Sequence, residues 1–214
     1  MSGMTDKLDI ISETIRRSFT DKDTAREQVL PLCREVIRYS SKAIRAVHRQ
    51  EFSPAGDLLG SAEGVLAQAK QATGGHEELG NTGFFRDAQK EYSEAAITLA
   101  LVTGGQIPSP GELGVEYAPY LNGMGEAVGE LRRFILDGIR REDFSRGEEL
   151  LEAMDDIYNV LVTMDYPDAI TGGLRRTTDM VRGVLEKTRS DLTLVMRQNK
   201  LEAKLRLLEK GFKQ

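Results

Sequence analysis

Residues 29–49 read VLPLCREVIRYSSKAIRAVHR, and their side chains recur with the period of an α-helix. The apolar residues fall on one side of that helix, as 3.6 residues per turn requires: Val29, Cys33, Val36, Ile37, Ala43, Ile44 and Val47. The cations fall on another side, in a row spaced by four, four, three and four residues: Arg34, Arg38, Lys42, Arg45 and Arg49. The stretch predicts a long helix that buries one face and exposes a row of five cations.

The same helical period continues on both sides of this stretch, whereas strand alternation is nearly absent. Helices are predicted over about residues 5–19, 23–51, 54–73, 84–102, 117–140, 142–164 and 174–210. Asp21-Lys22-Asp23 is expected to break the first helix from the second, and Pro31 to lie near the opening turns of the second. Short connections favour antiparallel neighbours, so we expect an all-α, seven-helix antiparallel bundle forming a single domain over residues 1–214.

Composition narrows the classes of protein that this chain can be. It has 34 acidic and 29 basic residues, a formal charge of −5, which argues against a wholly basic surface but allows a local basic face. The single cysteine, Cys33, excludes a disulfide framework and a cysteine zinc site, and its place on the apolar side predicts burial. No apolar run is long enough to span a membrane, and no signal peptide precedes the first helix, so we expect a cytoplasmic protein.

The row of cations has two interpretations. Like charges four residues apart cost a helix a few tenths of a kcal/mol each, so a structural reason for the row is not obvious. Binding the phosphates of a nucleic acid is one reason, and His48 borders the row. The alternative is a solvated face whose cations pair with acids from neighbouring helices.

Two pairs of carboxylates lie on successive predicted helices. Glu91 and Glu94 are three residues apart, and Glu126 and Glu130 are four apart, so each pair projects from one side of its helix. Four such carboxylates suit a hard divalent cation, Mg²⁺ or Mn²⁺. The alternative is that all four are ordinary solvated acids, because acids are common in this chain and Glu126 and Glu130 fall away from the apolar arc of their helix.

Glycines inside the predicted helix 117–140 are costly. Each of Gly123, Gly125 and Gly129 lowers helix stability by about 1 kcal/mol relative to Ala. Such positions predict a close approach by a partner, either another helix or a bound backbone. Other chemistries are set aside, because the chain has no Glu-x-x-His motif and no phosphate-binding glycine loop after a strand.

Read in order, these segments resemble the translin superfamily, and in particular its catalytic branch, typified by translin-associated factor X. The resemblance rests on Glu91-Tyr92-x-Glu94-Ala95, followed by Tyr120-Leu121-x-Gly123-x-x-Glu126-x-x-Gly129-Glu130-Leu131-x-Arg133. Val47-His48-Arg49 at the end of the basic helix and Ile157-Tyr158 in the sixth helix add to it. The family has Asp at the position of Glu126, so the carboxylate here is carried on a side chain one methylene longer.

The resemblance implies a translin-like all-α subunit that assembles into a hollow homo-octamer and binds single-stranded RNA or DNA. It implies RNA cleavage with Mg²⁺ inside the cavity, with the catalytic and metal-binding acids at Glu91, Glu94, Glu126 and Glu130. The cation row and His48 are then the expected RNA-binding residues. The last predicted helix carries more leucine and valine than one bundle needs, in keeping with an oligomer.

The expected function is therefore a Mg²⁺-dependent endoribonuclease acting on single-stranded RNA. Two alternatives stay open: a non-catalytic, translin-like protein that binds single-stranded RNA or DNA, and a purely structural helical scaffold. Salt-dependent binding separates the scaffold from the other two, and metal-dependent cleavage separates the nuclease from the binding protein.

Overall fold

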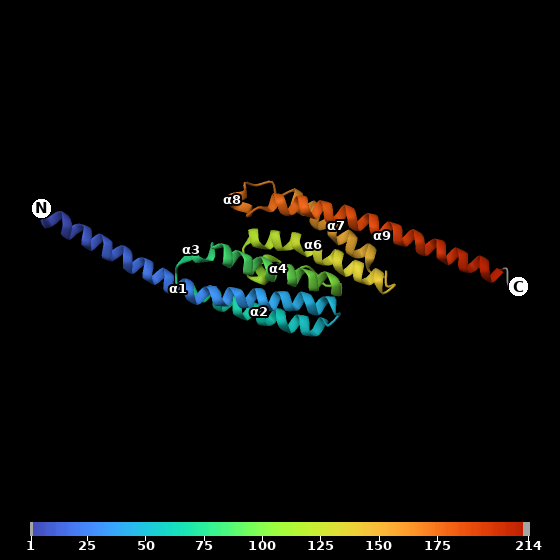
Figure 1. The fold of residues 1–214 in the computed structure, drawn as a ribbon, viewed down its shortest axis with the longest axis horizontal. Helices are drawn as coiled ribbons and strands as arrows, with labels where there is room; N and C mark the ends of the chain where they lie inside the picture. The colour runs from blue at the N-terminus through green and yellow to red at the C-terminus, as the bar shows by residue number, and fades with distance from the viewer. Residues whose placement is uncertain (1, 212–214) are drawn as a thin grey trace.

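The computed structural model describes residues 2–211, which form an elongated stack of helices (Figure 1). This range holds nine helices and no strand, so the expectation of an all-α fold is confirmed. Six helices are long: α1 (Ser2–His48), α2 (Phe52–Ala72), α4 (Gly83–Thr103), α6 (Tyr117–Arg140), α7 (Gly147–Val162) and α9 (Leu174–Gly211). Three have four residues each and lie in the connections: α3 (Glu77–Gly80), α5 (Pro110–Leu113) and α8 (Asp168–Thr171).

The first two predicted helices are one continuous helix, so the expected count of seven was wrong. Residues 21–23 lie within α1, because they are charged but include no Gly or Pro to end it. Lys22 also pairs with Glu78 of α3, at 2.8 Å between Nζ and Oε1. Pro31 lies deep inside α1 and not in an opening turn, at a helix-propensity cost of about 3 kcal/mol. Packing offsets this cost, since Val29 beside it is fully buried.

The helices lie in successive layers. α1 packs on α2 and α4, α4 packs on α6, and α6 packs on α7 and α9 (Figure 1). The largest fully buried side chains come from every layer: Val36, Val47, Ile97, Leu131, Leu150, Met154, Leu161 and Leu174. Cys33 is buried among them, as predicted, and burial raises the pKa of its thiol to about 11. The α4–α6 contact lies in the middle of the stack.

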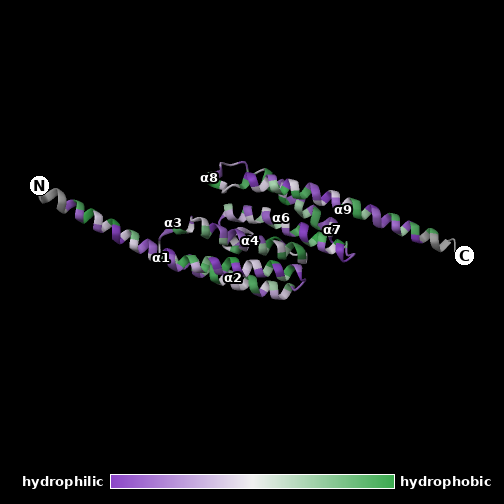
Figure 2. Ribbon diagram, in the orientation of Figure 1, coloured by the Kyte–Doolittle hydropathy of each residue, from purple (hydrophilic) through white to green (hydrophobic). Residues whose placement is uncertain are grey.

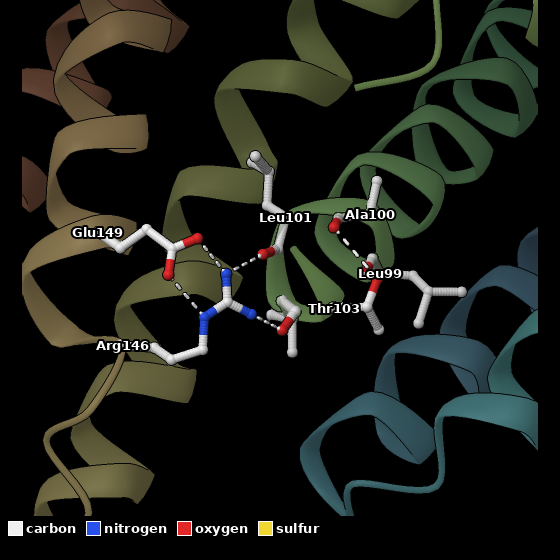
Figure 3. A network of polar contacts seen from close by, with 7 residues as sticks. Leu99, Ala100, Leu101, Thr103, Arg146 and Glu149 are labelled. Carbon is white, nitrogen blue, oxygen red and sulfur yellow. Dashed lines mark hydrogen bonds and ion pairs between the residues drawn. The ribbon is translucent and has the colours of Figure 1, made fainter. Parts of the chain in front are cut away.

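The C-terminal end of α4 is held by a side chain from the start of α7. Gly104 ends α4 in the left-handed conformation, with φ 76°. The Arg146 guanidinium donates to the carbonyl oxygen of Leu101 (3.1 Å) and to the Glu149 carboxylate (2.8 Å), as Figure 3 shows. It also donates to the carbonyl oxygen of Val102. These bonds satisfy carbonyls that a helix end leaves without partners, and they fix α4 against α7.

Two helix ends extend beyond the layers. The N-terminal part of α1 and the C-terminal part of α9 project at opposite ends of the molecule, and green apolar positions recur along both (Figures 1 and 2). Exposed apolar side chains lie three, four or seven residues apart on each: Leu8, Ile11, Ile15 and Phe19 on α1, and Leu194, Leu201, Leu205 and Leu208 on α9. Each end thus exposes an apolar stripe in a single chain. None of the described helices combines the length and the apolar character needed to cross a membrane.

Candidate functional site

Glycine allows α4 and α6 to approach closely at the centre of the stack. A Cβ on Gly123 would lie 2.5 Å from the carbonyl oxygen of Lys90 and 3.0 Å from the backbone nitrogen of Glu94, both in α4. A Cβ on Gly125 would overlap the methyl group of Thr177 in α9. Gly129 has no such neighbour within 4 Å. The expected helix partner is therefore confirmed for Gly123 and Gly125, whereas Gly129 faces open space.

The close approach brings together three of the four acids singled out from the sequence. Glu91 and Glu94 of α4 and Glu126 of α6 each offer one carboxylate oxygen, and these oxygens all lie within 4.8 Å of one another. Glu94 is 8% exposed, and the side chains of Glu91 and Glu126 are about one-third exposed. The three form a partly enclosed cluster on two helices, here called the carboxylate cluster. Glu94 is therefore not an ordinary solvated acid, whereas Glu91 and Glu126 stay partly exposed.

Burial and mutual repulsion disfavour the charged forms of the carboxylate cluster. Burial, together with the charges of Glu91, Glu126 and Glu130, raises the pKa of Glu94 to about 8. Burial also raises the pKa of Glu91, and the carboxylate of Glu126 adds to this effect. The neutral form of Glu94 is therefore favoured at pH values well above the usual range of a carboxyl group.

Lys90 places a positive charge at the cluster. Its Nζ donates to Glu126 Oε1 at 2.8 Å and lies 3.8 Å from Glu91 Oε1. Burial works against the charged form, but the hydrogen bond to Glu126 and the nearby carboxylates raise the pKa of Lys90. The ammonium partly offsets the repulsion among the acids. Sequence reasoning missed Lys90, although it directly precedes the motif that begins at Glu91.

Glu130 lies apart from the carboxylate cluster because it is bonded to His48 of α1. His48 Nε2 donates to Glu130 Oε2, and this bond lowers the pKa of Glu130. The His48 side chain is only 5% exposed, and its Nδ1 lies 3.9 Å from Asp137 Oδ2. Among the side chains described, that Nδ1 is the one buried nitrogen or oxygen without a hydrogen-bond partner. The structure thus turns His48 inward, away from the cation row with which the sequence grouped it.

All five cations of the row are exposed, as predicted: four lie along α1, and Arg49 lies directly after its end. Arg38 pairs with Glu35 in the same helix, and Arg49 pairs with Glu51 in the following turn. No carboxylate of the described side chains lies within 4.0 Å of Arg34 or Lys42. The interpretation as a face paired with acids from neighbouring helices is not supported, since the pairs found are local. The row presents its charge to solvent.

Solved structures, and not a family model, show which proteins this chain resembles. No family model matches the chain. The crystal structure of AfC3PO is 31% identical, and the match covers 87% of this chain and 97% of that one with a TM-score of 0.80. AfC3PO in complex with duplex RNA is also 31% identical, over 87% and 96% of the two chains, with a TM-score of 0.79.

Two further proteins are similar. Apo-NeC3PO, 16% identical over 86% of this chain and 96% of that one, has the same fold at a TM-score of 0.76. The uncharacterized protein MJ0175 of Methanocaldococcus jannaschii is 29% identical over 199 residues, which are 91% of this chain and 86% of that protein.

The layered all-α fold, with 31% identity to AfC3PO over 87% of this chain, defines a protein of the C3PO type. The chain belongs to the translin superfamily, as its motifs indicated.

Proposed function

We propose that this protein is a metal-dependent endoribonuclease that binds and cleaves single-stranded RNA inside the cavity of a homo-octamer. The observation that carries this proposal is the carboxylate cluster, in which oxygens of Glu91, Glu94 and Glu126 lie within 4.8 Å of one another. The partner is supported by AfC3PO, which is similar over most of its length and has been solved with duplex RNA. Membership of the translin superfamily is consistent with both.

The donor set of the carboxylate cluster suits Mg²⁺ or Mn²⁺. Hard divalent cations prefer oxygen ligands, and three carboxylate oxygens converge here with one of them buried. Burial and the neighbouring carboxylates raise the pKa of Glu94, and a cation among these oxygens would offset that repulsion. Glu91, Glu94 and Glu126 would hold the cation, and Glu130 would join them only by giving up its bond to His48. A cation of this kind supplies Lewis-acid chemistry, lowering the pKa of water and offsetting charge on a phosphate.

The chain's own groups would complete the site. Glu94 gives up its proton when the carboxylates act as ligands. Lys90 keeps its proton and presents a positive charge at the edge of the cluster, where a phosphate would lie. His48 is buried against Glu130, so it is not available as half of a histidine pair acting on a ribose 2′-hydroxyl. The expected product therefore carries a 5′-phosphate and not a 2′,3′-cyclic phosphate.

The cation row on α1 would supply affinity that does not depend on RNA sequence. Arg45 precedes His48 by three residues of α1, about one turn, and the His48 side chain turns inward from there to Glu130 of α6. Arg34 and Lys42 have no carboxylate within 4.0 Å among the described side chains and keep their charge for phosphates. The row and the carboxylate cluster are thus connected through α1 and α6.

The protruding helix ends support an assembly of several copies. An isolated helix with an exposed apolar stripe gains little stability in water without a partner surface. The stripes on α1 and α9 provide such surfaces at both ends of each subunit. A second copy of this chain is the proposed partner, and a hollow octamer is the proposed assembly.

One observation favours the non-catalytic alternative. Lys90 already pairs with Glu126 and lies near Glu91, so part of the negative charge of the cluster is compensated without a metal ion. A protein that only binds RNA would retain this ion pair.

The test is incubation of the purified protein with end-labelled single-stranded RNA, and with the same strand in a duplex, in Mg²⁺, Mn²⁺ or EDTA. The proposal expects cleavage of the single strand with either metal and none in EDTA. Salt-dependent binding without cleavage would leave the translin-like binding protein, and absence of both would leave the structural scaffold.

A further inference from the structure

A second feature adjoins the carboxylate cluster: a cavity of about 380 Å³ between α4, α6 and the start of α9. Its walls include Arg86 and Lys90 from one face of α4, Glu126 from α6, and Arg176 from α9. Lys90 and Glu126 also belong to the site described above, so the cavity and the cluster share a wall. Its volume is in the range of sites that hold a small ligand or one group of a larger one.

Two of the cationic groups in the cavity wall have no ion-pair partner among the described residues. Lys90 is paired with Glu126. The other charged groups in the wall are the guanidinium groups of Arg86 and Arg176 and the carboxylate of Asp87. No carboxylate of the described chain lies within 4.0 Å of Arg86 or Arg176. Among the described residues, the Arg86 side chain makes one polar contact, a long 3.5 Å bond to Asn81 Oδ1. Two guanidinium groups are therefore free to bind an anion.

The wall that carries Arg176 is fixed to α6 by a buried amide. Asn122 Nδ2 donates to the carbonyl oxygen of Thr171 at 2.8 Å, at the end of α8. Thr177 Oγ1 donates to Asn122 Oδ1 at 2.7 Å. Asn122 is 7% exposed, and its bonds join the start of α9 to the helix that bears Glu126. Arg176 is thus presented from a positioned helix and not from a loose surface segment.

We propose that this cavity binds a phosphate group of a nucleic-acid strand through Arg86 and Arg176, next to the carboxylate cluster. Guanidinium groups match phosphate oxygens with paired N–H donors, which makes arginine well suited to this ligand. Arg86 precedes Glu94 by eight residues of α4, a rise of about 12 Å, so the strand would be held a short distance from the acids. The inference rests on the proposed function, because it takes the same RNA as ligand.

The test measures RNA affinity in EDTA, where cleavage does not enter. The affinity of a fixed single-stranded RNA is measured over a salt series for the wild type and for the double variant Arg86→Gln, Arg176→Gln. Each lost phosphate contact makes the negative slope of log K against log salt shallower by about 0.7 for a single strand. The double variant is therefore expected to have a slope smaller in magnitude by about 1.4. If the variant and the wild type bind RNA equally at 1 M salt, this difference in slope makes the variant bind about 25-fold more weakly at 0.1 M salt.

Two controls separate the cavity from general charge. Arg182→Gln with Lys187→Gln removes two exposed cations of α9 outside the cavity and should leave the slope unchanged. Arg86→Lys with Arg176→Lys keeps the charge and should restore most of the slope. If the double glutamine variant does not fold, Arg176→Gln alone carries the test with a fall of about 0.7, because Arg176 is exposed.

The outcomes distinguish the two proposals. A wild-type slope in the double glutamine variant, with RNA bound, overturns the cavity proposal and leaves the nuclease proposal intact. Failure of the wild type to bind RNA at all overturns both. A loss confined to RNA with a 5′-phosphate assigns a terminal phosphate to the cavity, and an equal loss with 5′-hydroxyl RNA assigns an internal one.

Discussion

Gly123→Ala is expected to damage the site through the packing of two helices and not through any change in charge. The added Cβ would lie 2.5 Å from the carbonyl oxygen of Lys90 and 2.9 Å from Ser93 Cβ, both in α4. A helix backbone cannot rotate away as a long side chain can. The α4–α6 distance must therefore grow by about 0.9 Å to restore an ordinary contact of 3.4 Å.

Two magnitudes follow from this displacement. Overpacking of a close contact costs about 1–3 kcal/mol, and the better helix propensity of Ala returns about 1 kcal/mol of it. The displacement also separates Glu126 from Glu91 and Glu94, and a misplacement of about 1 Å can lower a reaction rate about 100-fold. We expect a small loss of stability and a much larger loss of RNA cleavage.

Gly129→Ala is the matched control, because it lies in the same helix with no atom within 4 Å of the added Cβ. It should raise the free energy of unfolding by about 1 kcal/mol. Urea unfolding at one fixed protomer concentration and single-turnover cleavage of labelled RNA measure the two effects. Equal stability and equal cleavage in the two alanine variants would refute the packing argument.

Three further predictions concern charge, pH and assembly. Replacing Arg38, Lys42 and Arg45 together by Ala should lower the salt slope of single-stranded RNA binding by about 2, and an unchanged slope would show that the row does not contact phosphates. Glu94 has a pKa of about 8 when folded and near 4.5 when unfolded, so the folded state binds the extra proton between these values. Stability should fall as pH rises from about 4.5 to 8, and Glu94→Gln should flatten this dependence in urea unfolding without metal. Light scattering should give eight times the chain mass of 23.8 kDa for the wild type. Leu205→Asp, which places a charge in the apolar stripe of α9, should lower this mass, and a monomeric wild type would contradict the assembly.

The triple substitution on α1 has its own matched control. Arg197, Lys200 and Lys204 are exposed cations on the protruding end of α9. Their joint replacement by Ala removes the same charge from another surface and should leave the salt slope of RNA binding within error of the wild type.

The central helices could be predicted from sequence because clear signals end them. Gly104 and Gly105 end α4, and the predicted range 117–140 coincides with α6. The helix boundaries were predicted wrongly in two places. The charged residues 21–23 do not end a helix, and the start of α7 depends on the conformation of a turn residue. The helix predicted over 142–164 is α7, which begins at Gly147 and not near 142. Glu142 adopts φ 59°, in the turn that follows α6.

The candidate site could be predicted only as far as its contacts are local. Glu91 and Glu94 share one side of a single helix, and helix spacing is visible in the sequence. The bond of Glu130 to His48 spans 82 residues, and the bond of Lys90 to Glu126 spans 36, so both depend on how the layers pack. Sequence spacing alone grouped Glu130 with the other acids and His48 with the cation row. The positions of both side chains follow from the contact between α1 and α6.

The most direct test of the account is cleavage of end-labelled single-stranded RNA in Mg²⁺ by the wild type, Glu126→Gln and the matched control Glu152→Gln. Glu152 is an exposed acid of α7 outside the carboxylate cluster. The account predicts that the wild type and Glu152→Gln release products with a 5′-phosphate, and that Glu126→Gln binds the RNA at least as well but does not cut it. Cleavage by Glu126→Gln at the wild-type rate would contradict the assignment of the carboxylate cluster as the catalytic site.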